Sequence, residues 1–245
     1  MTAWYVDHGL RPESKWEESL VHEITEALGA EFQSRSVHVV DGPNLEARAR
    51  EARFAALPHD VLTGHTADDQ AETVLLNLLR GSSTSGLSGM RTERHPLLSL
   101  RRSETRALCT ELGLQPVIDP MNADGRFQRV RVRRDLIPLL ADISKRDIVD
   151  VLARQAQFLR DDDNLLDELA ALIDVTDAKA LSAAPLALAR RAVRQWLSNP
   201  LPPDSATVER VLAVARGETT ACDVGAGRNV RRSHQRLGVV VRDVL

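Results

Sequence analysis

The chain has 245 residues, 43% of them hydrophobic and 27% charged, which is the composition of an ordinary globular protein long enough to bury a core. Its formal net charge of −3 argues against a general attraction to nucleic acid, so any site for a polyanion must be a local patch. The two cysteines, Cys109 and Cys222, argue against a disulfide scaffold, a zinc ribbon or a cysteine-held cluster and fit a reducing cytoplasm. No apolar run approaches the ~20 residues of a membrane span.

The first part of the chain alternates strand-like and helix-like segments. Short apolar runs ended by turn residues predict strands, and amphipathic stretches between them predict helices. We expect strands at 3–6, 37–40 and 60–63, and helices at 14–29 and 44–57 (capped by Asn44). A third helix is expected after the last of these strands, with Asp68 in its first turn and Arg80 at its other end. This alternation predicts a parallel sheet with helices on both faces, in which ligands bind beyond the carboxyl ends of the strands. Two such ends are Asp7-His8-Gly9 and Gly64-His65-Thr66.

After residue 81 the pattern changes to a mainly helical one. GSSTSGLSGM (81–90) is a small-residue loop of the kind that moves or lies against a ligand. We expect a helix at 103–112, an extended piece at 116–120, helices at 148–173, 185–197 and 205–217, and a hairpin at 221–241 with GAGRN in its turn. A boundary near 145–150 would divide the chain into domains 1–147 and 148–245.

The helix that follows residue 66 carries more charge than its apolar stripe explains. Ala71, Val74, Leu75, Leu78 and Leu79 form the stripe, while Asp69 and Glu72 lie on one flank and face the same way. Two carboxylates this close repel each other and favour a cation between them. One interpretation is that acids in a first turn only complement the helix dipole. The other is a site for a metal or for a substrate ammonium group, and the residues alone leave both open.

Arginines gather in a second charged segment, where Arg129, Arg131, Arg133 and Arg134 fall within six residues. If this segment is extended, the first three share one face, and such a row can follow nucleic-acid phosphates. A solvated surface is the alternative. A further basic patch is predicted in the tail, at Arg228, Arg231, Arg232, His234 and Arg236.

Residues 64–90, GHTADDQAETVLLNLLRGSSTSGLSGM, closely resemble the central signature of the tRNA(Ile)-lysidine synthetase family. That signature reads G-H-x-x-D-D-Q-x-E-T, then R-G, then G-L-x-x-M. VDHGLR at 6–11, HPLL at 95–98, D-x-x-N at 119–122 and IPLL at 137–140 agree with it. The resemblance covers essentially the whole chain. It implies an α/β adenine-nucleotide α-hydrolase-like (PP-loop) domain, incomplete at its N-terminus, followed by a smaller helical tRNA-binding domain that ends in a β-hairpin.

Enzymes of this family ligate free L-lysine to C2 of cytidine 34 in the CAU anticodon of an isoleucine tRNA, with ATP and Mg²⁺. The resemblance implies that ATP first adenylates the base and that the lysine amine then displaces AMP. It implies a cytoplasmic enzyme with no membrane partner, and it leaves a homodimer open.

The resemblance also assigns roles to the charged residues. Asp68, Asp69 and Glu72 match motif positions suited to the amino groups of lysine or to the metal. Arg80 would pair with the lysine carboxylate or with a phosphate. The expected nucleotide contacts are Asp7, His8 and His65, of which His65 can instead stabilise the turn. Arg129, Arg131, Arg133 and Arg134 would contact tRNA phosphates.

Two features depart from the family pattern. The ATP-binding loop S-G-G-x-D-S, whose backbone amides cradle pyrophosphate, is not in the sequence, and an arginine-asparagine pair reads Arg129-Val130. We therefore expect an N-terminally truncated chain that binds ATP poorly and has impaired activity. The alternatives are another PP-loop tRNA-modifying enzyme, such as a thiolase or an amidotransferase-type synthetase, and a non-catalytic tRNA-binding remnant.

Overall fold

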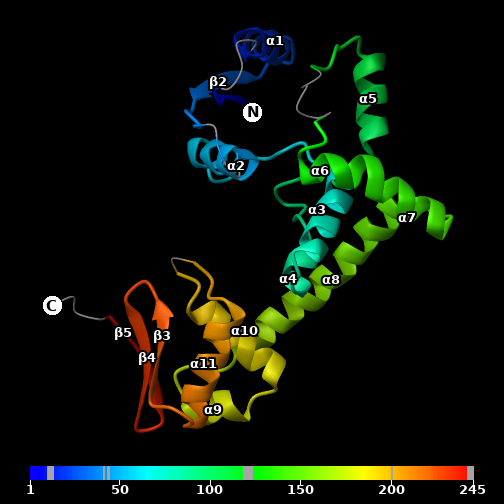
Figure 1. Cartoon of the computed structure of the whole chain (residues 1–245). Coiled ribbons are helices and arrows are strands. Elements are labelled where there is room, and N and C mark those ends of the chain that lie inside the picture. The colour runs from blue at the N-terminus through cyan, green and yellow to red at the C-terminus, as the bar shows by residue number, and fades with distance from the viewer. Residues whose placement is uncertain (10–13, 41, 43–44, 118–123, 200, 242–245) are drawn as a thin grey trace. The chain divides into compact units, whose positions relative to one another are not determined.

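The computed structural model describes residues 1–9, 14–40, 42, 45–117, 124–199 and 201–241 (Figure 1). Their contacts divide the chain into two compact units, Met1–Leu76 with Met90–Ala153 and Asn77–Gly89 with Arg154–Leu245. The division into domains 1–147 and 148–245 stays a prediction. The predicted cap Asn44, the D-x-x-N motif and most of the predicted extended piece at 116–120 lie outside the described residues.

A parallel pair of strands opens the first unit. β1 (Thr2–Asp7) pairs with β2 (Glu31–Ser36), from Thr2 opposite Glu31 to Asp7 opposite Ser36. The intervening helix α1 (Ser14–Ala27) packs against both strands. Gly29, at φ +65°, lets the chain leave the helix in the left-handed conformation that glycine adopts without strain. This βαβ unit confirms the predicted parallel-sheet α/β class, and α2 (Leu45–Ala56) follows it as predicted.

Two strand predictions are wrong. The second strand is β2 at 31–36 and not 37–40, because its partner β1 ends at Asp7, whose carbonyl oxygen accepts the last bond from the Val37 N–H at 2.7 Å. Residues 60–63 form no strand either. There the Thr63 N–H donates to the Arg94 carbonyl at 2.9 Å, a single bond to an irregular segment and not a ladder.

Helix α3 (Ala67–Leu79) forms where the sequence predicts it. Its buried residues Ala67 and Ala71 form a small apolar cluster with Val149 from α8 (Ile148–Ala171). Val74 and Leu75 are buried as well, but Leu78 is 57% and Leu79 70% exposed, so the predicted stripe covers only the first part of the helix. The helix α5 (Arg102–Glu111) also forms as predicted.

The arginine-rich segment is helical, so the extended conformation that would place Arg129, Arg131 and Arg133 on one face does not occur. α6 (Gln128–Arg131) continues without interruption into a π-helical turn, η2 (Val132–Leu136), and then into α7 (Ile137–Ser144). Helical hydrogen bonds are made within the segment itself, whereas an extended segment would need a neighbouring strand to pair with. Val130 and Val132 are buried, which fixes the orientation of the arginines around them.

The second unit has a helical core. α10 (Leu186–Trp196) and α11 (Ser205–Arg216) form as predicted, and α9 (Ala178–Ala183) is an additional short helix. Their apolar faces form one cluster with side chains of the C-terminal strands, including Leu181, Val193, Leu197, Val211 and Val230. The Asp204 side chain caps α11 through the Thr207 N–H at 2.7 Å, and Gly217 ends it at φ +81°.

The small-residue loop belongs to this second unit and contains α4 (Thr84–Leu87). Asp163 of α8, 3% exposed, accepts hydrogen bonds from Thr84 Oγ1 at 3.1 Å and from Arg191 Nη2 at 2.6 Å. A Cβ on Gly86 would lie 2.5 Å from Ser82 Cβ, so only glycine fits this turn. The loop is therefore anchored to α8 and α10 by buried polar contacts.

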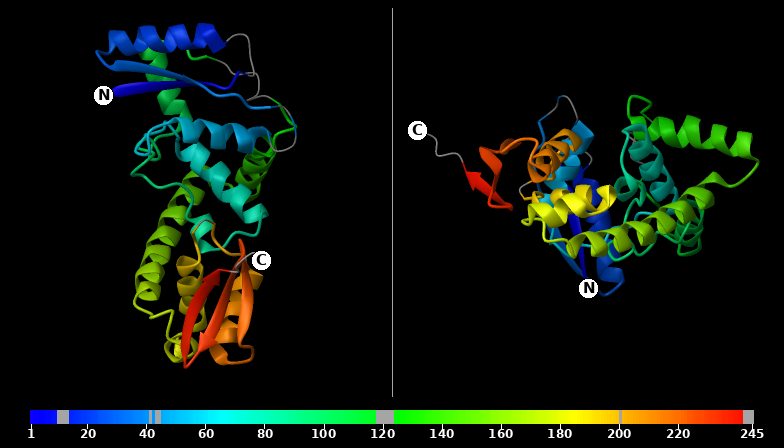
Figure 2. Two further views of the ribbon diagram at one scale, coloured as in Figure 1. Left: turned by 90° about the vertical axis from the view of Figure 1, so that its left-hand side faces the viewer. Right: turned by 90° about the horizontal axis from the view of Figure 1, so that it is seen from below.

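The chain ends in a three-stranded antiparallel sheet, where a two-stranded hairpin was predicted. Its order is β3 (Ala221–Gly225), β4 (Arg228–Ser233) and β5 (Arg236–Val241), and Figure 2 shows the three strands side by side. The first turn lies at Gly225–Gly227, as predicted. The second uses His234 and Gln235 at φ 46° and 65°, a left-handed conformation that no glycine marks in the sequence. α11 packs against β3 and β4.

No helix in the described part of the chain is long and apolar enough to cross a membrane.

Candidate functional site

The N-terminus of α3 places its acids by local capping. Thr66 precedes the helix, and Asp69 Oδ2 accepts hydrogen bonds from the Thr66 N–H and from Thr66 Oγ1, both at 2.9 Å. A carboxylate at the third helical position that reaches back to the cap N–H is one arm of a capping box, and the positive end of the helix dipole favours its charge. Local capping thus fixes one oxygen of Asp69 and leaves Oδ1 to face Glu72, one turn along the helix.

Three arginine side chains converge on the Glu72 carboxylate, which is 0% exposed. Arg133 donates in bidentate fashion, from Nε to Oε1 at 2.7 Å and from Nη2 to Oε2 at 3.2 Å. Arg129 Nε donates to Oε2 at 2.6 Å, and Arg102 Nη2 donates to Oε1 at 3.1 Å. Arg129 and Arg102 also reach Asp69 Oδ1, at 3.0 and 2.9 Å. We call Asp69, Glu72, Arg102, Arg129 and Arg133 the acid–arginine cluster.

Positive charge exceeds negative charge in the acid–arginine cluster, because three guanidinium groups face two carboxylates. Burial raises the pKa of Asp69, but the hydrogen bonds from Thr66 and the charges of Arg102 and Arg129 outweigh burial and lower the pKa below its ordinary value. Asp69 is therefore ionised at neutral pH. The cation that the paired acids require comes, in this structure, from the chain's own arginines.

Asp68 has a different set of partners. Its Oδ2 accepts a hydrogen bond from the Arg102 backbone N–H at 2.7 Å and one from Arg101 Nε at 3.4 Å. Arg101 Nη1 also donates to Asp147 at 2.6 Å and to Asp150 at 3.0 Å. Asp68 thus ties the start of α3 to the start of α5, and Arg101 links both to the start of α8.

Two histidines share one hydroxyl group next to the cluster. Thr63 Oγ1 lies 2.6 Å from His65 Nδ1 and 2.5 Å from His95 Nδ1, and the two rings meet edge to face at 4.9 Å. A hydroxyl has one proton, so it can donate to only one of these nitrogens and must accept from the other. The two rings therefore carry different tautomers when both are neutral, and one of them presents an unprotonated Nε2.

His65 stays neutral at physiological pH. Burial lowers its pKa to about 4; the charge of Asp69 opposes this, while His95, Arg129 and Arg50 add to it. Burial, Arg50 and Arg94 also lower the pKa of His95. In the unfolded chain His65 takes up a proton near pH 6.5, but in the folded chain only near pH 4.

A pH-dependent stability follows from His65. Between about pH 6.5 and 4 the unfolded state binds more protons, so the free energy of unfolding falls as the pH is lowered through this window. We expect His65→Asn to lose less stability than the wild type between pH 7 and pH 5 in urea unfolding. An equal loss in both proteins would contradict the buried neutral state of His65.

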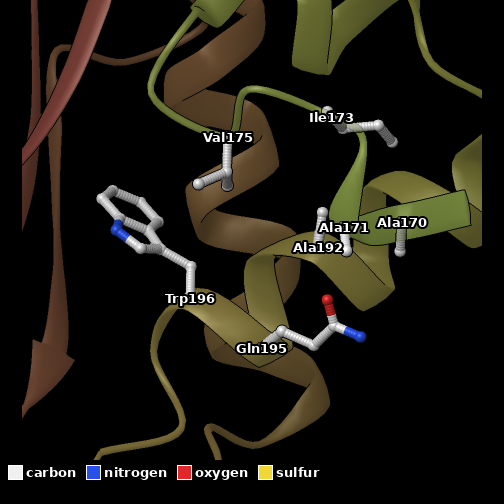
Figure 3. Close-up of a pocket in the computed structure, with 7 residues that line it drawn as sticks. All are labelled: Ala170, Ala171, Ile173, Val175, Ala192, Gln195 and Trp196. Carbon is white, nitrogen blue, oxygen red and sulfur yellow. The ribbon is translucent and has the colours of Figure 1, made fainter. Parts of the chain in front are cut away.

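The pocket drawn in Figure 3 is formed by residues of the second unit, whereas the acid–arginine cluster belongs to the first. Its volume is about 160 Å³, and it is lined by Ile173 and Val175 after α8 and by Gln195 and Trp196 of α10. The Gln195 amide donates to Asp167 at 2.8 Å. None of the predicted site residues lines this pocket, so the acid–arginine cluster is the stronger candidate for a functional site.

Comparison with known proteins identifies the family of the chain. Residues 1–140 match the family model of the PP-loop domain, and residues 177–238 match that of the TilS substrate binding domain. The tRNA(Ile)-lysidine synthase of Nocardia farcinica is 44% identical over 80% of this chain and 67% of its own length. Those of Mycolicibacterium paratuberculosis and Mycobacterium leprae are 45% and 42% identical, over 80% and 81% of this chain and 66% and 68% of their own lengths. The chain belongs to the tRNA(Ile)-lysidine synthase family.

The chain spans about two thirds of the length of these lysidine synthases. A solved structure, a U34-tRNA thiolase from Methanococcus maripaludis, is similar at 19% identity and a TM-score of 0.49, over 64% of this chain and 61% of that chain. Membership of the lysidine synthase family confirms the predicted family and, with it, the PP-loop fold class.

Within the family signature, Gln70 is a residue whose role the sequence analysis missed. Its side-chain amide is buried and donates from Nε2 to the Met90 carbonyl at 3.2 Å, while Oε1 accepts from the Met90 N–H at 2.8 Å. Gln70 thus joins the two ends of the signature, G-H-x-x-D-D-Q and G-L-x-x-M. In the sequence, its position between Asp69 and Glu72 was the feature that could have indicated a role for Gln70.

Several of the predicted site residues do not contact the acid–arginine cluster. Arg80 is exposed beyond the end of α3 and belongs to the second unit. Arg131 is 72% exposed beside Asp135, and Arg134 is exposed too. Asp7 Oδ1 accepts the Gly9 N–H at 2.8 Å, which closes the turn after β1 where His8 lies. The roles of these residues stay predictions.

The tail patch is tied into the second unit by its own hydrogen bonds. Arg228 donates to the Asn199 carbonyl, Arg232 to Gln235 at 2.6 Å, and Arg236 to Asp174 at 2.7 Å. Arg231 is exposed. This patch also stays a prediction for tRNA contact.

Proposed function

We propose that the protein catalyses the ATP-dependent ligation of lysine to cytidine 34 of isoleucine tRNA, forming lysidine. The observation that carries this proposal is the match of both its parts, the PP-loop domain and the TilS substrate binding domain, together with relatives named tRNA(Ile)-lysidine synthase. Since tRNA is the substrate, we infer that it works in the cytoplasm. A homodimer rests on the family resemblance alone.

Asp69 and Glu72 are the proposed binding residues for the amino groups of lysine. They lie side by side, Asp69 is ionised, and their oxygens already accept hydrogen bonds from cationic donors, the chemistry that an ammonium group supplies. The arginines of the cluster would pair with the lysine carboxylate or with phosphate. His65 and His8, with Asp7 at the end of β1, are the proposed nucleotide contacts.

These acids do not fit a Mg²⁺ site as they are arranged. A magnesium ion needs free carboxylate oxygens, but both oxygens of Glu72 and Oδ1 of Asp69 face guanidinium groups, and Oδ2 of Asp69 accepts hydrogen bonds from Thr66. Among the described residues, no group of three or more His, Cys, Asp or Glu side chains could hold a metal. We propose that Mg²⁺ arrives on the phosphates of ATP, which supplies the energy for the ligation as it is split to AMP and pyrophosphate.

A lysine-incorporation assay tests the proposed function. We expect a version of the protein that carries the family's S-G-G-x-D-S loop to transfer radiolabelled lysine to a tRNA(Ile) transcript with a CAU anticodon only when ATP is present. The 245-residue chain, whose sequence lacks that loop, should transfer lysine poorly. The matched transcript with uridine in place of cytidine 34 should take up none. We further expect Asp69→Asn to lower incorporation at least roughly 30-fold, since truncating one partner of a buried charge pair costs about 2–5 kcal/mol. No incorporation by the loop-containing protein would overturn the proposal.

A further inference from the structure

The acids that the proposed function assigns to lysine already hold guanidinium groups. Arg133 contacts Glu72 through two hydrogen bonds, and Arg129 bridges Glu72 and Asp69. An arginine of the same chain competes with free lysine as an intramolecular ligand, with an effective concentration on the order of millimolar. Free lysine therefore meets an occupied site unless these arginines acquire another partner.

A nucleic-acid phosphate is such a partner. Guanidinium groups bind carboxylate and phosphate with the same bidentate geometry. The Arg129 and Arg133 side chains are 23% and 29% exposed, whereas Glu72 is fully buried, so a phosphate can reach the arginines but not the glutamate. The same segment also exposes Arg131 and Arg134. An anticodon arm that arrives at this surface would compete directly for the two inner arginines.

The element that carries these arginines is suited to rearrange. Arg129 and Arg133 are four residues apart, so one face of the continuous α6–η2 segment presents both. Arg133 lies in the π-helical turn, a rare and wide conformation that often occurs at functional sites. A shift of this turn to α-helical hydrogen bonding would rotate Arg133 around the helix axis and move it away from Glu72.

We propose that Arg129 and Arg133 are exchangeable counterions of the lysine site, an inference that rests on the proposed function. Without tRNA they neutralise Asp69 and Glu72; when tRNA binds, they move to its phosphates and leave the two carboxylates to the lysine ammonium group. Lysine and tRNA then bind with positive coupling, and by linkage each raises the affinity of the other by the same factor. The protein would thereby select lysine only when its tRNA is present.

Equilibrium dialysis of labelled lysine, without ATP, tests the coupling. In the unmodified full-length protein we expect the tRNA(Ile) transcript to raise lysine affinity by roughly 5–150-fold, the usual range for coupled sites. In Arg133→Gln, where a neutral donor remains for Glu72, lysine should bind more tightly without tRNA. The factor by which tRNA raises lysine affinity should then fall toward one. The matched control is Arg131→Gln, on the same segment but away from the acids, which should weaken tRNA binding and leave lysine affinity without tRNA unchanged.

A second variant keeps the proposal testable if Arg133→Gln does not fold. Glu72→Gln releases both arginines, so tRNA should bind more tightly. The slope of log tRNA affinity against log salt concentration should become steeper by about 0.7–0.9 for each additional phosphate that the released arginines neutralise. Asp142→Asn, an exposed acid of α7, removes the same charge without freeing an arginine of the cluster and should leave the slope unchanged. A purely structural role for the cluster predicts the opposite sign, a loss of tRNA affinity in Glu72→Gln.

The failures of the two proposals are distinguishable. Lysine affinity that is equal with and without tRNA, in a protein that still forms lysidine, overturns the exchange and leaves the proposed function standing. The same holds if the coupling in Arg133→Gln equals that of the unmodified protein. Absence of both lysidine formation and lysine binding overturns the proposed function itself.

Discussion

Replacing Glu72 with alanine should lower the free energy of unfolding of the first unit by about 3–5 kcal/mol, the usual effect of removing one partner from a buried ion pair. Glu72 is 0% exposed and accepts four hydrogen bonds from three arginines. Without it Arg102 and Arg129 keep only Asp69 as a carboxylate partner, Arg133 loses its partner in the cluster, and the three guanidinium groups repel one another. Lysine incorporation should fall at least as far as in Asp69→Asn, because the same site loses its more deeply buried acid.

The three tryptophans make this measurement specific to one unit. Trp4 and Trp16 lie in the first unit and Trp196 lies in the second. In a Trp196→Phe background, fluorescence during urea unfolding reports the first unit alone. Glu111→Ala, an exposed glutamate at the end of α5, is the matched control and should change the unfolding free energy by less than about 0.5 kcal/mol. A Glu72→Ala protein as stable as this control would show that the cluster contributes nothing to the fold.

Replacing Leu181 with alanine should destabilise the second unit by about 2–5 kcal/mol, as expected for a leucine truncated in a well-packed core. Leu181 of α9 is 1% exposed and belongs to the core cluster of that unit. With Trp4 and Trp16 replaced by phenylalanine, Trp196 reports this transition. Leu172→Ala is the control: Leu172 is 82% exposed, so its truncation should cost less than about 0.5 kcal/mol. Equal effects at the two leucines would refute the assigned core.

Helices were predictable where apolar residues recur at helical spacing and a capping residue precedes them. The predicted helices at 148–173 and 205–217 are found at 148–171 and 205–216, the latter capped by Asp204. Strands were harder, because pairing partners decide them. EFQSRS forms β2 although it has no β-branched residue, since β1 supplies its ladder. The more strand-like 37–40 begins where β1 ends and keeps only the single bond from Val37 to Asp7.

In the candidate site, too, contacts between residues close in sequence were predictable, and contacts between distant segments were not. The spacing of Asp69 and Glu72 within one helix put the two acids side by side. Their partners could not be found in that way, because Arg102, Arg129 and Arg133 come from segments 30 to 61 residues along the chain from Glu72. For the arginine run, both a phosphate-contacting row and a solvated surface were considered. In the structure Arg129 and Arg133 instead donate hydrogen bonds to Glu72.

The contact between Gln70 and Met90 has a consequence for how the intervening loop can vary. A primary amide presents one donor and one acceptor on neighbouring atoms, so Gln70 reproduces for Met90 the hydrogen-bonding pair that a residue of an adjacent β-strand would provide. The register of the backbone at Met90 is thus set from α3, independently of the number of residues between them. Relatives could lengthen or shorten residues 81–83 without displacing Met90, whereas glutamate at position 70, which lacks the donor, would lose that register at constant loop length.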